Sequence, residues 1–407
     1  MHLRHLSLTN FRVYARLELE LPAGPILICG DNAQGKTSLL EAVYYLATAR
    51  SPHTSSDRQL IHWLAGDEGL TPYARLVGDV SRADRACHVE VTLMLESANT
   101  AEGVRFRKQI KVNGSLSRVA DLARQINIVM FLPQDVDLAG AAPGGRRRSL
   151  DYTLSQIDVD YAIAVDHYAD VLAQRNALLK QLQESSGDPD QLAYWDDQLA
   201  ADGAAITLKR QIALDELGRA ADRIHRDLTG GQADLRLRYQ PALDMTRTPA
   251  AEYQIALDLD VPAVSVPHAH RVEAAFLAQL QERRAEEIGA GMTLIGPHRD
   301  DFRFISDQVD LGTYGSRGQQ RTAVLALKLA EVEWIHDKIG DWPILLFDEV
   351  MAELDAQRRT YLLSRIGSVS QSLLTTTDPS LFSAEFRARA KTLRVTTGRI
   401  EEVGSGR

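Results

Sequence analysis

Nine residues near the start of the chain have the types and the spacing that binding a phosphate chain requires. Residues 30–37 match the pattern G-x-x-x-x-G-K-[ST] at every defined position. The two glycines let backbone N–H groups turn toward phosphate oxygens, Lys36 supplies a cation for the β- and γ-phosphates, and the Thr37 hydroxyl is a ligand for Mg²⁺. The stretch therefore predicts a site for a nucleoside triphosphate with Mg²⁺. Its candidate contacts are Gly30, Asp31, Asn32, Ala33, Gln34, Gly35, Lys36, Thr37 and Ser38.

Two acidic residues far along the chain supply the rest of the chemistry that such a site needs. Asp348 and Glu349 follow the apolar run 344–347, which predicts a buried parallel strand. Ligands of open α/β sheets bind at the carboxyl ends of the strands, so Asp348 is expected to hold the Mg²⁺ shell. Glu349 is placed to act as the general base for a water molecule that attacks the γ-phosphate. Because most of the chain separates Lys36 from Asp348, we expect an inserted domain rather than a compact nucleotide kinase.

A third motif, residues 316–319, reads Ser-Arg-Gly-Gln and precedes a long helical pattern through Leu325, Leu329 and Val332. A serine hydroxyl and a glycine amide at a helix N-terminus form an anion site. An ordinary helix cap uses the same residue types, so the four residues alone are a weak signal. Their place one helix ahead of Asp348 favours the anion site.

These motifs must be positioned by an α/β core to which both ends of the chain contribute. Alternating leucines before Pro22 predict a half-buried strand, and residues 26–28 predict a buried strand that leads into the glycine-rich loop. A helix over residues 36–49 follows the loop. Strands and helices alternate again from Met292 onward, which is typical of a return to the α/β domain.

Between these ends the pattern changes to long helices. Apolar residues recur at helical spacing over 161–182, with Arg175 interrupting one step, and again over 191–228. A short polar turn separates the two runs, which predicts an antiparallel helical hairpin. The expected domains are an N-terminal part of the head over 1–140, an inserted helical arm over 141–291 and a C-terminal part of the head over 292–407.

The composition restricts the class of protein. The chain has 407 residues, of which 44 % are hydrophobic and 25 % charged, as in a soluble protein of two or three domains. No apolar run approaches the ~18 residues of a membrane helix, and the two cysteines exclude a disulfide scaffold. Without an apolar signal stretch at its start, the chain is expected in the cytoplasm. The net charge of −9 disfavours non-specific coating of nucleic acid but allows a local basic surface.

Taken together, the motifs make nearly the whole chain resemble the RecF family of bacterial recombination mediators, which is related to the SMC and Rad50 heads. The resemblance rests on the glycine-rich loop, residues 316–319 and the acidic pair at 348–349. Further matching segments are 10–12, 47–51, 131–135, 146–148 with Asp151, 296–301, 353–355 and 371–378.

The resemblance implies an ABC-type P-loop ATPase head formed by both chain ends, with an inserted helical arm. It implies an ATP-dependent DNA-binding protein that dimerises on ATP. Such a protein would act with RecR, and with RecO through it, at single-strand/double-strand junctions, and would favour RecA loading during DNA repair and replication. It also implies that Arg12 approaches the nucleotide, that Gln134 senses Mg²⁺ and water, and that the partner's site is closed by Ser316, Gly318 and Gln319.

Two departures from the ABC-type pattern point to slow turnover. Arg317 stands where ABC transporters have glycine, and the strand over 371–378 carries threonines where a histidine switch would stand. A slow, switch-like DNA-dependent ATPase is therefore expected. Two alternatives stay open, a small-molecule P-loop kinase and a nucleotide-gated interaction module without turnover.

Five arginines are the candidates for contact with DNA. Arg105 and Arg107 share one face of a predicted strand, and Arg146, Arg147 and Arg148 form a basic run. Since no base-reading motif is apparent, contact with double-stranded DNA is expected to be directed at phosphates. Both groups could equally be solvated surface charges.

Overall fold

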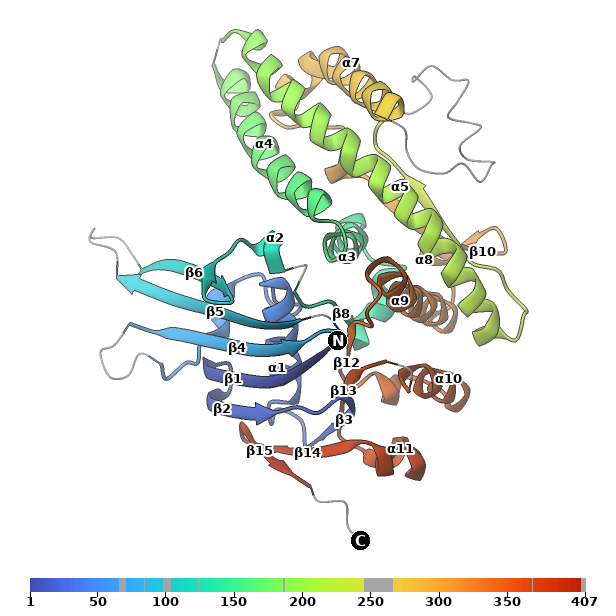
Figure 1. Ribbon diagram of the computed structural model, residues 1–407. Coiled ribbons are helices and arrows are strands. Elements are labelled where there is room, and N and C mark those ends of the chain that lie inside the picture. Colours follow the sequence, from blue (N-terminus) through green and yellow to red (C-terminus); the bar gives the residue numbers. More distant parts are fainter. Residues whose placement is uncertain are drawn as a thin grey trace. The chain divides into compact units, whose positions relative to one another are not determined.

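The computed structural model describes residues 1–65, 71–83, 85–97, 104–122, 125–185, 187–244, 266–367 and 369–403, which form two compact units. The sheet unit combines residues 1–136 with 328–407, and the helical unit comprises residues 137–327. Both ends of the chain therefore build one unit, and the other is inserted between them (Figure 1).

A six-stranded sheet in the order β15-β14-β3-β13-β12-β8 carries the predicted buried strands. The strands β3, β8, β12, β13 and β14 run parallel to one another, and only β15 is antiparallel. Every residue of β8, β12 and β13 is buried, which explains the continuous apolar runs of β8 and β12. The strands are β3 (Gly24–Cys29), β8 (Ile128–Phe131), β12 (Ile344–Phe347), β13 (Gln371–Thr376), β14 (Lys391–Thr396) and β15 (Arg399–Glu402).

A second sheet of the same unit is antiparallel and has the order β2-β1-β4-β5-β6-β7. Helix α1 (Lys36–Thr48) contacts strands of both sheets, and their side chains form one continuous core with it. Because both of its sides are covered, α1 is apolar around most of its circumference. The strands are β1 (His2–Phe11), β2 (Tyr14–Glu20), β4 (Tyr73–Ser81), β5 (Ala86–Ser97), β6 (Val104–Val112) and β7 (Ser115–Leu116).

Short helices complete the sheet unit. They are the α-helices α2 (Val119–Leu122), α10 (Ala356–Ile366) and α11 (Ala384–Arg389), and the 3-10 helices η1 (Asp57–Leu60), η6 (Val350–Glu353) and η7 (Pro379–Leu381). The 3-10 helix η2 (Pro133–Leu138) stands where the chain passes from the sheet unit to the helical unit.

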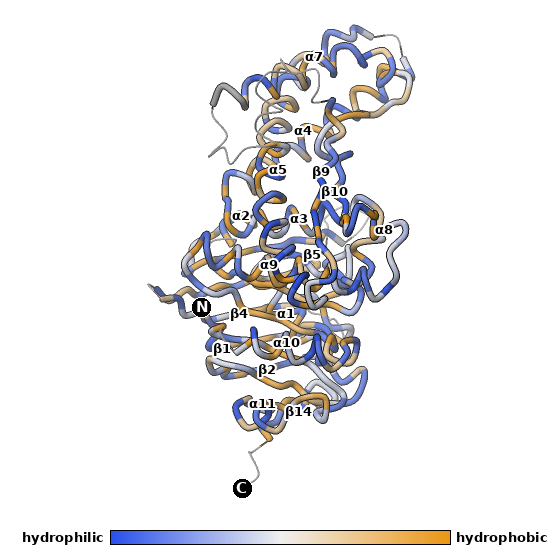
Figure 2. Tube along the Cα trace, turned by 90° about the vertical axis from the view of Figure 1, so that its right-hand side faces the viewer, coloured by the Kyte–Doolittle hydropathy of each residue, from blue (hydrophilic) through white to orange (hydrophobic). Residues whose placement is uncertain are grey.

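The helical unit contains the predicted pair of long helices, α4 (Val159–Glu184) and α5 (Ala193–Thr229), which pack against each other and against α7 (Val266–Ala290). Figure 2 shows apolar and polar residues alternating along these helices, as in helices that bury one face. The other elements are α3 (Pro143–Ser155), η3 (Pro189–Leu192), β9 (Arg236–Gln240), η5 (Pro297–Arg299), β10 (Asp301–Ser306), β11 (Val309–Asp310) and α8 (Leu311–Tyr314). Helix α9 (Arg317–Ile339) begins in this unit.

The helical unit is longer than the sequence suggested, since it ends at residue 327 and not at 291. The reason lies in the contacts of β10, which pairs with β9 in a three-stranded sheet and places Phe304 opposite Leu237. Arg146 of α3 also binds Asp301 at the start of β10. These contacts join residues 292–327 to the helices.

Arg175, which interrupts the apolar pattern of α4, is fully buried in the helical unit. Its guanidinium lies 2.8 Å from a carboxylate oxygen of Asp196 and 2.7 Å from one of Glu287, and it donates to the Thr293 hydroxyl at 2.8 Å. Arg284 binds the other oxygen of Asp196 at 3.0 Å. The two arginines and two acids therefore balance in charge where the three long helices meet, as buried ions require.

Among the described residues, no helix is both long and apolar enough to cross a membrane.

Candidate nucleotide-binding site

The order of the parallel sheet brings the two predicted motifs to one edge. The glycine-rich loop follows β3 and Asp348 follows β12, and β13 lies between these two strands. All three strands are parallel, so their carboxyl ends meet at the same edge, where open α/β sheets bind ligands. The loop and the acidic pair therefore face one place although most of the chain separates them in sequence.

Both glycines of the loop are required by close approach of other backbone and side-chain atoms. A Cβ at Gly30 would lie 2.4 Å from the Val395 carbonyl oxygen. Gly35 has a φ of +118°, and a Cβ there would lie 2.8 Å from Val13 Cγ2. The Tyr14 hydroxyl donates to the Gly35 carbonyl at 3.0 Å, which fixes the last turn of the loop before α1. The loop shape is thus built into the packing of the sheet unit.

Lys36 is only 5 % exposed and its ammonium is held inside the loop. Its Nζ donates to the carbonyl oxygens of Gly30 at 2.7 Å and Asp31 at 2.9 Å. It also lies 3.1 Å from Oε1 of Glu349, with which it forms an ion pair. The predicted phosphate-binding cation and the predicted base are therefore direct neighbours.

Oxygen atoms that suit Mg²⁺ converge on Asp348, which is 5 % exposed. Its Oδ1 accepts hydrogen bonds from the Thr37 hydroxyl at 3.0 Å and from the Thr375 hydroxyl at 2.8 Å. Hydroxyl and carboxylate oxygens are the ligands that Mg²⁺ prefers, and Mg²⁺ in nucleotide sites takes its remaining ligands from phosphate and water. The hydroxyl of Thr37 and the carboxylate of Asp348 therefore fit a Mg²⁺ ion that would also be bound by phosphate and water.

Glu349 stands in the left-handed region, with a φ of +53°. Its backbone N–H donates to the Thr375 hydroxyl at 2.9 Å, and its Oε2 accepts the N–H of Thr377 at 3.3 Å. A non-glycine residue in this region is strained unless its surroundings hold it, and such strain gathers at functional sites. Thr375 of β13 and Thr377, directly after this strand, hold Glu349 here.

Thr375 is the site residue that sequence analysis did not single out. It is one of three consecutive threonines at the end of β13, and only its hydroxyl reaches Asp348. Thr376 instead closes a local turn with Asp378, with both hydrogen bonds at 3.0 Å. Successive side chains of a strand point to opposite faces of the sheet, so Thr375 and Thr376 face different sides. This alternation in a central strand is the signal that could have distinguished Thr375 from Thr376.

Arg12 lies at the end of β1 and has a partner on α1. Its Nε and Nη2 bind the two oxygens of Glu41 at 2.7 Å each, and its Nη1 donates to the Gln59 carbonyl at 3.1 Å. Glu41 is 2 % exposed, and this buried acid within an apolar helix was a signal that a cation must lie nearby. The nucleotide contact expected of Arg12 stays a prediction.

Gln134 is exposed in η2, as a residue that senses a ligand must be. The next residue, Asp135, accepts the N–H of Leu132 at 2.7 Å, and burial raises the pKa of its carboxyl group. The role predicted for Gln134 is therefore open to test, while Asp135 serves the packing of the turn.

In the helical unit, residues 316–319 start α9 and are exposed. The Gln319 side chain accepts the N–H of Ser316 at 2.8 Å, and the Ser316 hydroxyl accepts the N–H of Gln319 at 3.3 Å. This reciprocal pair is a capping box. It leaves the hydroxyl, the Gly318 amide and the helix end facing solvent, where a ligand can reach them.

The five arginines predicted to contact DNA differ in exposure. Arg105 and Arg107 are exposed on β6, and Arg107 lies 3.4 Å from Glu96. Arg148 is exposed on α3, whereas Arg147 is half-buried and donates to the Asp300 carbonyl at 2.5 Å. For Arg146 the prediction of DNA contact is wrong. Its side chain is 1 % exposed, and its guanidinium binds Asp301 and the Ala139 carbonyl oxygen within the helical unit.

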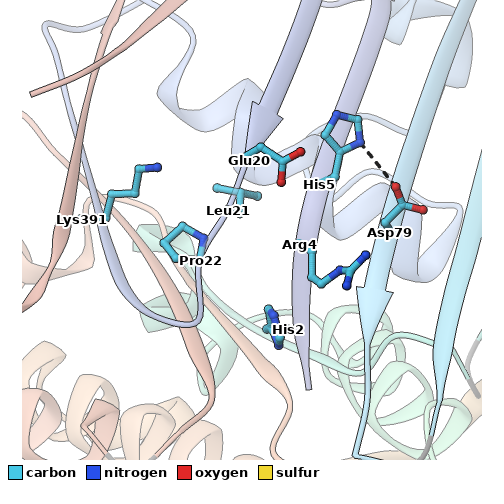
Figure 3. Close-up of a pocket in the computed structure, with 8 residues that line it drawn as sticks. All are labelled: His2, Arg4, His5, Glu20, Leu21, Pro22, Asp79 and Lys391. Atoms are coloured by element: carbon cyan, nitrogen blue, oxygen red, sulfur yellow. Dashed lines mark ion pairs between the residues drawn. The ribbon is translucent and has the colours of Figure 1, made fainter.

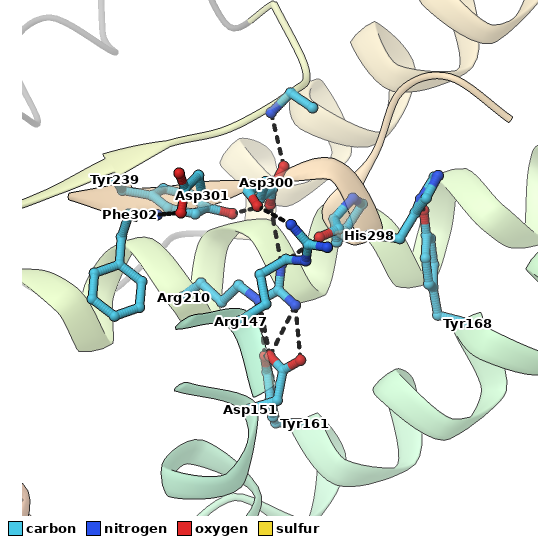
Figure 4. A network of polar contacts seen from close by, with 12 residues as sticks. Arg147, Asp151, Tyr161, Tyr168, Arg210, Tyr239, His298, Asp300, Asp301 and Phe302 are labelled. Atoms are coloured by element: carbon cyan, nitrogen blue, oxygen red, sulfur yellow. Dashed lines mark hydrogen bonds and ion pairs between the residues drawn. The ribbon is translucent and has the colours of Figure 1, made fainter. Parts of the chain in front are cut away.

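The segment 296–301, which matched the family without a known role, is a hub of the helical unit (Figure 4). Asp300 accepts hydrogen bonds from Arg210 of α5 at 3.2 Å, from the Tyr239 hydroxyl of β9 and from the Ala242 N–H at 2.8 Å. Arg210 also binds both oxygens of Asp151, at 2.8 and 3.0 Å. The network therefore ties α3, α5 and β9 to the start of β10.

His298, a neighbour in the same segment, is a structural residue. Its Nδ1 lies 2.8 Å from the Tyr168 hydroxyl and its Nε2 lies 3.2 Å from the Thr293 carbonyl oxygen. Burial lowers the pKa of the imidazole to about 4, so the ring is neutral near pH 7.

A cleft of about 600 Å³ in the sheet unit holds none of the predicted site residues (Figure 3). Its walls carry both signs of charge. They are formed by His2, Arg4, His5, Glu20, Leu21, Pro22, Asp79 and Lys391.

Comparison with known proteins agrees with the fold and the motifs. Residues 2–400 match the family model described as the RecF/RecN/SMC N terminal domain. The chain is 41 % identical to the DNA replication and repair protein RecF of Chloroflexus aggregans, with 98 % of this chain and 99 % of that protein covered. It is 36 % identical to the RecF protein of Thermomicrobium roseum, again over 98 % of this chain and all of that protein.

Solved structures give the same result. A structure described as the recombination mediator protein RecF with ATP in the RecFOR pathway matches with a TM-score of 0.82, at 28 % identity over 99 % of this chain and 98 % of that one. An SMC head domain from Pyrococcus furiosus matches with a TM-score of 0.51 at 15 % identity, covering 99 % and 96 %, which shows a shared fold. The predicted ABC-type head fold is confirmed, and the chain belongs to the RecF family of DNA replication and repair proteins.

Proposed function

We propose that this protein is an ATP-dependent DNA-binding recombination mediator whose ATP-bound state is a homodimer. It binds double-stranded DNA beside single-strand gaps, acts with RecR and through it with RecO, and promotes RecA loading in the cytoplasm at the nucleoid. The observation that carries the proposal is the convergence of Lys36, Thr37 and Asp348 at one edge of the parallel sheet. The names of its relatives and of the similar RecF structure with ATP support it.

In this proposal, the loop binds the triphosphate of ATP through its backbone N–H groups and the ammonium of Lys36. A Mg²⁺ ion held at this site would supply positive charge to the β- and γ-phosphates. Thr37 holds Mg²⁺ directly, and Asp348 and Gln134 hold it in part through water. The 3.0 Å contact between the Thr37 hydroxyl and Asp348 supports this assignment.

Glu349 acts as the general base. Its carboxylate is 3.1 Å from the Lys36 ammonium, and this ion pair holds the carboxylate in place. Phosphate oxygens compete for Lys36 when ATP binds, which frees Glu349 to orient a water molecule. Slow hydrolysis that serves as a switch follows from this competition.

Dimerisation completes the site with residues of a second subunit. Ser316, Gly318 and Gln319 would meet the γ-phosphate bound by the partner, since their helix end is exposed and carries the positive end of the α9 dipole. For DNA we retain Arg105, Arg107 and Arg148, which are exposed, and Arg147 in part.

Sedimentation with and without ATP and a gapped duplex tests the proposal. We expect a monomer without ATP and a DNA-bound dimer with it, and Lys36→Ala should remain monomeric. The same oligomeric state in all samples would contradict the switch. Phosphorylation of a metabolite would favour a kinase, and ATP-dependent dimers without any phosphate release would favour a gated module.

A further inference from the structure

The hairpin of β14 and β15 supports the phosphate-binding loop from outside. Strand β14 lies beside β3, the strand that leads into the loop, and β15 turns back along β14 (Figure 1). At the start of the loop, a Cβ on Gly30 would lie 2.4 Å from the Val395 carbonyl oxygen of β14. Near its other end, Gln34 accepts two hydrogen bonds from the two residues that join β14 to β15. The loop therefore contacts the hairpin at both of its ends.

Gln34 binds the hairpin through its side chain and through its backbone. Its Oε1 accepts the N–H of Thr397 at 2.6 Å, and its carbonyl oxygen accepts the N–H of Gly398 at 3.0 Å. Because a planar trans peptide directs its C=O and its N–H to opposite sides, the second bond turns the N–H of residue 35 away from the hairpin. The Tyr14 hydroxyl, which donates to the carbonyl of residue 35, acts in the same way on the N–H of residue 36. Successive backbone N–H groups that are free to face a ligand make an anion site.

The turn between β14 and β15 has an unusual first residue. Thr397 and Gly398 are its two central residues, since Thr396 pairs with Arg399, and their φ values are +46° and +72°. Two-residue turns of this kind need a positive φ at both positions, which glycine tolerates but a β-branched threonine rarely adopts. Such strain persists only where the surroundings hold it. Because Gln34 holds the N–H of Thr397, the loop and the turn support each other.

Gly398 cannot be replaced without moving this turn. A Cβ at position 398 would lie 2.7 Å from the Val13 carbonyl oxygen. Val13 in turn contacts the loop, because a Cβ on Gly35 would lie 2.8 Å from its Cγ2. A side chain at position 398 should therefore displace the turn from both Val13 and Gln34, although this position lies outside the loop.

We propose that Gln34 is a positioning residue, whose side chain keeps the β14–β15 turn against the loop so that the loop N–H groups face the phosphates before ATP arrives. This inference rests on the proposed function, and it changes the role of the Gln34 side chain from a direct contact with the nucleotide to a support of the loop. Preorganisation of this kind reduces the free-energy cost of binding. Because coupling between two sites is reciprocal, bound ATP should also stabilise the turn.

The test compares Gln34→Leu, which removes the side-chain acceptor, with Gly398→Ala, which displaces the turn. Gly340→Ala is the matched control, since Gly340 has a similar φ of +76° but nothing in the described part of the chain lies within 4 Å of the added Cβ. Three quantities are measured for each full-length protein. They are the dissociation constant for ATP with Mg²⁺, the rate of phosphate release at saturating ATP, and the amide hydrogen exchange of residues 391–402 with and without ATP.

The expected loss concerns binding and not turnover. One neutral hydrogen bond corresponds to about 2- to 13-fold in an equilibrium constant, so Gln34→Leu and Gly398→Ala should each raise the dissociation constant for ATP by about that factor. Phosphate release at saturating ATP should stay within about twofold of wild type, because neither change touches the contacts of Asp348. The effects of the two changes should not add in the double variant, since both release one contact. Gly340→Ala should bind ATP like the wild type.

Hydrogen exchange separates a positioning role from a merely structural one. ATP should slow the exchange of the Thr397 and Gly398 amides in the wild type, and this effect should be absent in Gln34→Leu. Unchanged ATP affinity in both variants would overturn the proposal, as would an equal loss in Gly340→Ala. A loss in Gln34→Leu alone would mean that its side chain contacts the nucleotide directly, which also overturns it. Should Gly398→Ala fail to fold, the exchange measured in Gln34→Leu decides. Absence of ATP binding in the wild type would instead refute the proposed function.

Discussion

Thr375→Val removes one hydroxyl from the centre of the candidate site and leaves the shape of the side chain nearly unchanged. The hydroxyl donates to Asp348 at 2.8 Å and accepts the Glu349 N–H at 2.9 Å. Thr375 is 1 % exposed, so water cannot replace either bond. The variant therefore tests whether β13 positions both acidic residues.

The two hydrogen bonds that the variant removes set the size of the effect. A hydrogen bond to a charged group contributes roughly 1.5–3 kcal/mol, and a buried N–H left without a partner costs about 1–3 kcal/mol. Since Asp348 retains the bond from Thr37, we expect the free energy of unfolding of the sheet unit to fall by about 2–4 kcal/mol. The loosened Asp348 should also weaken Mg²⁺-dependent ATP binding about tenfold, which corresponds to about 1.4 kcal/mol.

Urea denaturation measures the stability, and titration of a fluorescent ATP analogue at several Mg²⁺ concentrations measures the binding. Thr375→Ser is the matched control, because it keeps the hydroxyl and should lose only the ~1 kcal/mol of one buried methyl group. Thr376→Val is the second control, since its hydroxyl serves a local turn away from Asp348. If Thr375→Val matched Thr375→Ser in both measurements, the hydroxyl would not position the acids.

Four further outcomes follow from the same geometry. Lys36→Ala should abolish ATP-dependent dimers seen by sedimentation while circular dichroism stays unchanged. Glu349→Gln should keep ATP binding but slow phosphate release by ~10²–10⁴-fold, as expected for loss of a general base, and an unchanged rate would exclude that role. Ser316→Arg should bind ATP as a monomer but not dimerise, and mixing it with Lys36→Ala should restore part of the ATPase activity if the sites are shared. Replacing Arg105 and Arg107 by glutamine should weaken the salt dependence of DNA binding. The slope of log affinity against log salt concentration should fall by about one unit for each DNA phosphate that is no longer neutralised. An unchanged slope would show that both arginines are solvated surface charges.

The phosphate site could be predicted from the sequence because its requirements are local. A loop between a buried strand and a helix must have glycines where other atoms approach, and Gly30 and Gly35 meet that demand against Val395 and Val13. A parallel sheet then makes the position of Asp348 predictable, since the carboxyl ends of its strands share an edge. Both predictions rest on the motif and the strand pattern alone, and the contacts with Val395 and Val13 then explain why glycine is needed.

Partners from distant segments could not be predicted in the same way. Glu41 and Arg12 bind each other across the boundary between α1 and β1, and the sequence places neither beside the other. The end of the helical unit was misplaced for a similar reason. Residues 301–306 read like another strand of the α/β domain, and it is their pairing with β9 and the bond between Asp301 and Arg146 that join them to the helices.

The basic run at 146–148 shows why a charge pattern alone misleads. Three adjacent arginines point in three directions around a helix, about 100° apart, so at most part of the run can face solvent together. Pro143 was a usable signal for the helix start, because proline favours the first helical position. With the helix placed there, Arg146 falls on the face of Leu150, Thr153 and Leu154, all of which are buried. An arginine on such a face must find acceptors inside the protein, so burial implies that Arg146 needs a partner, and the structure shows that this partner is Asp301.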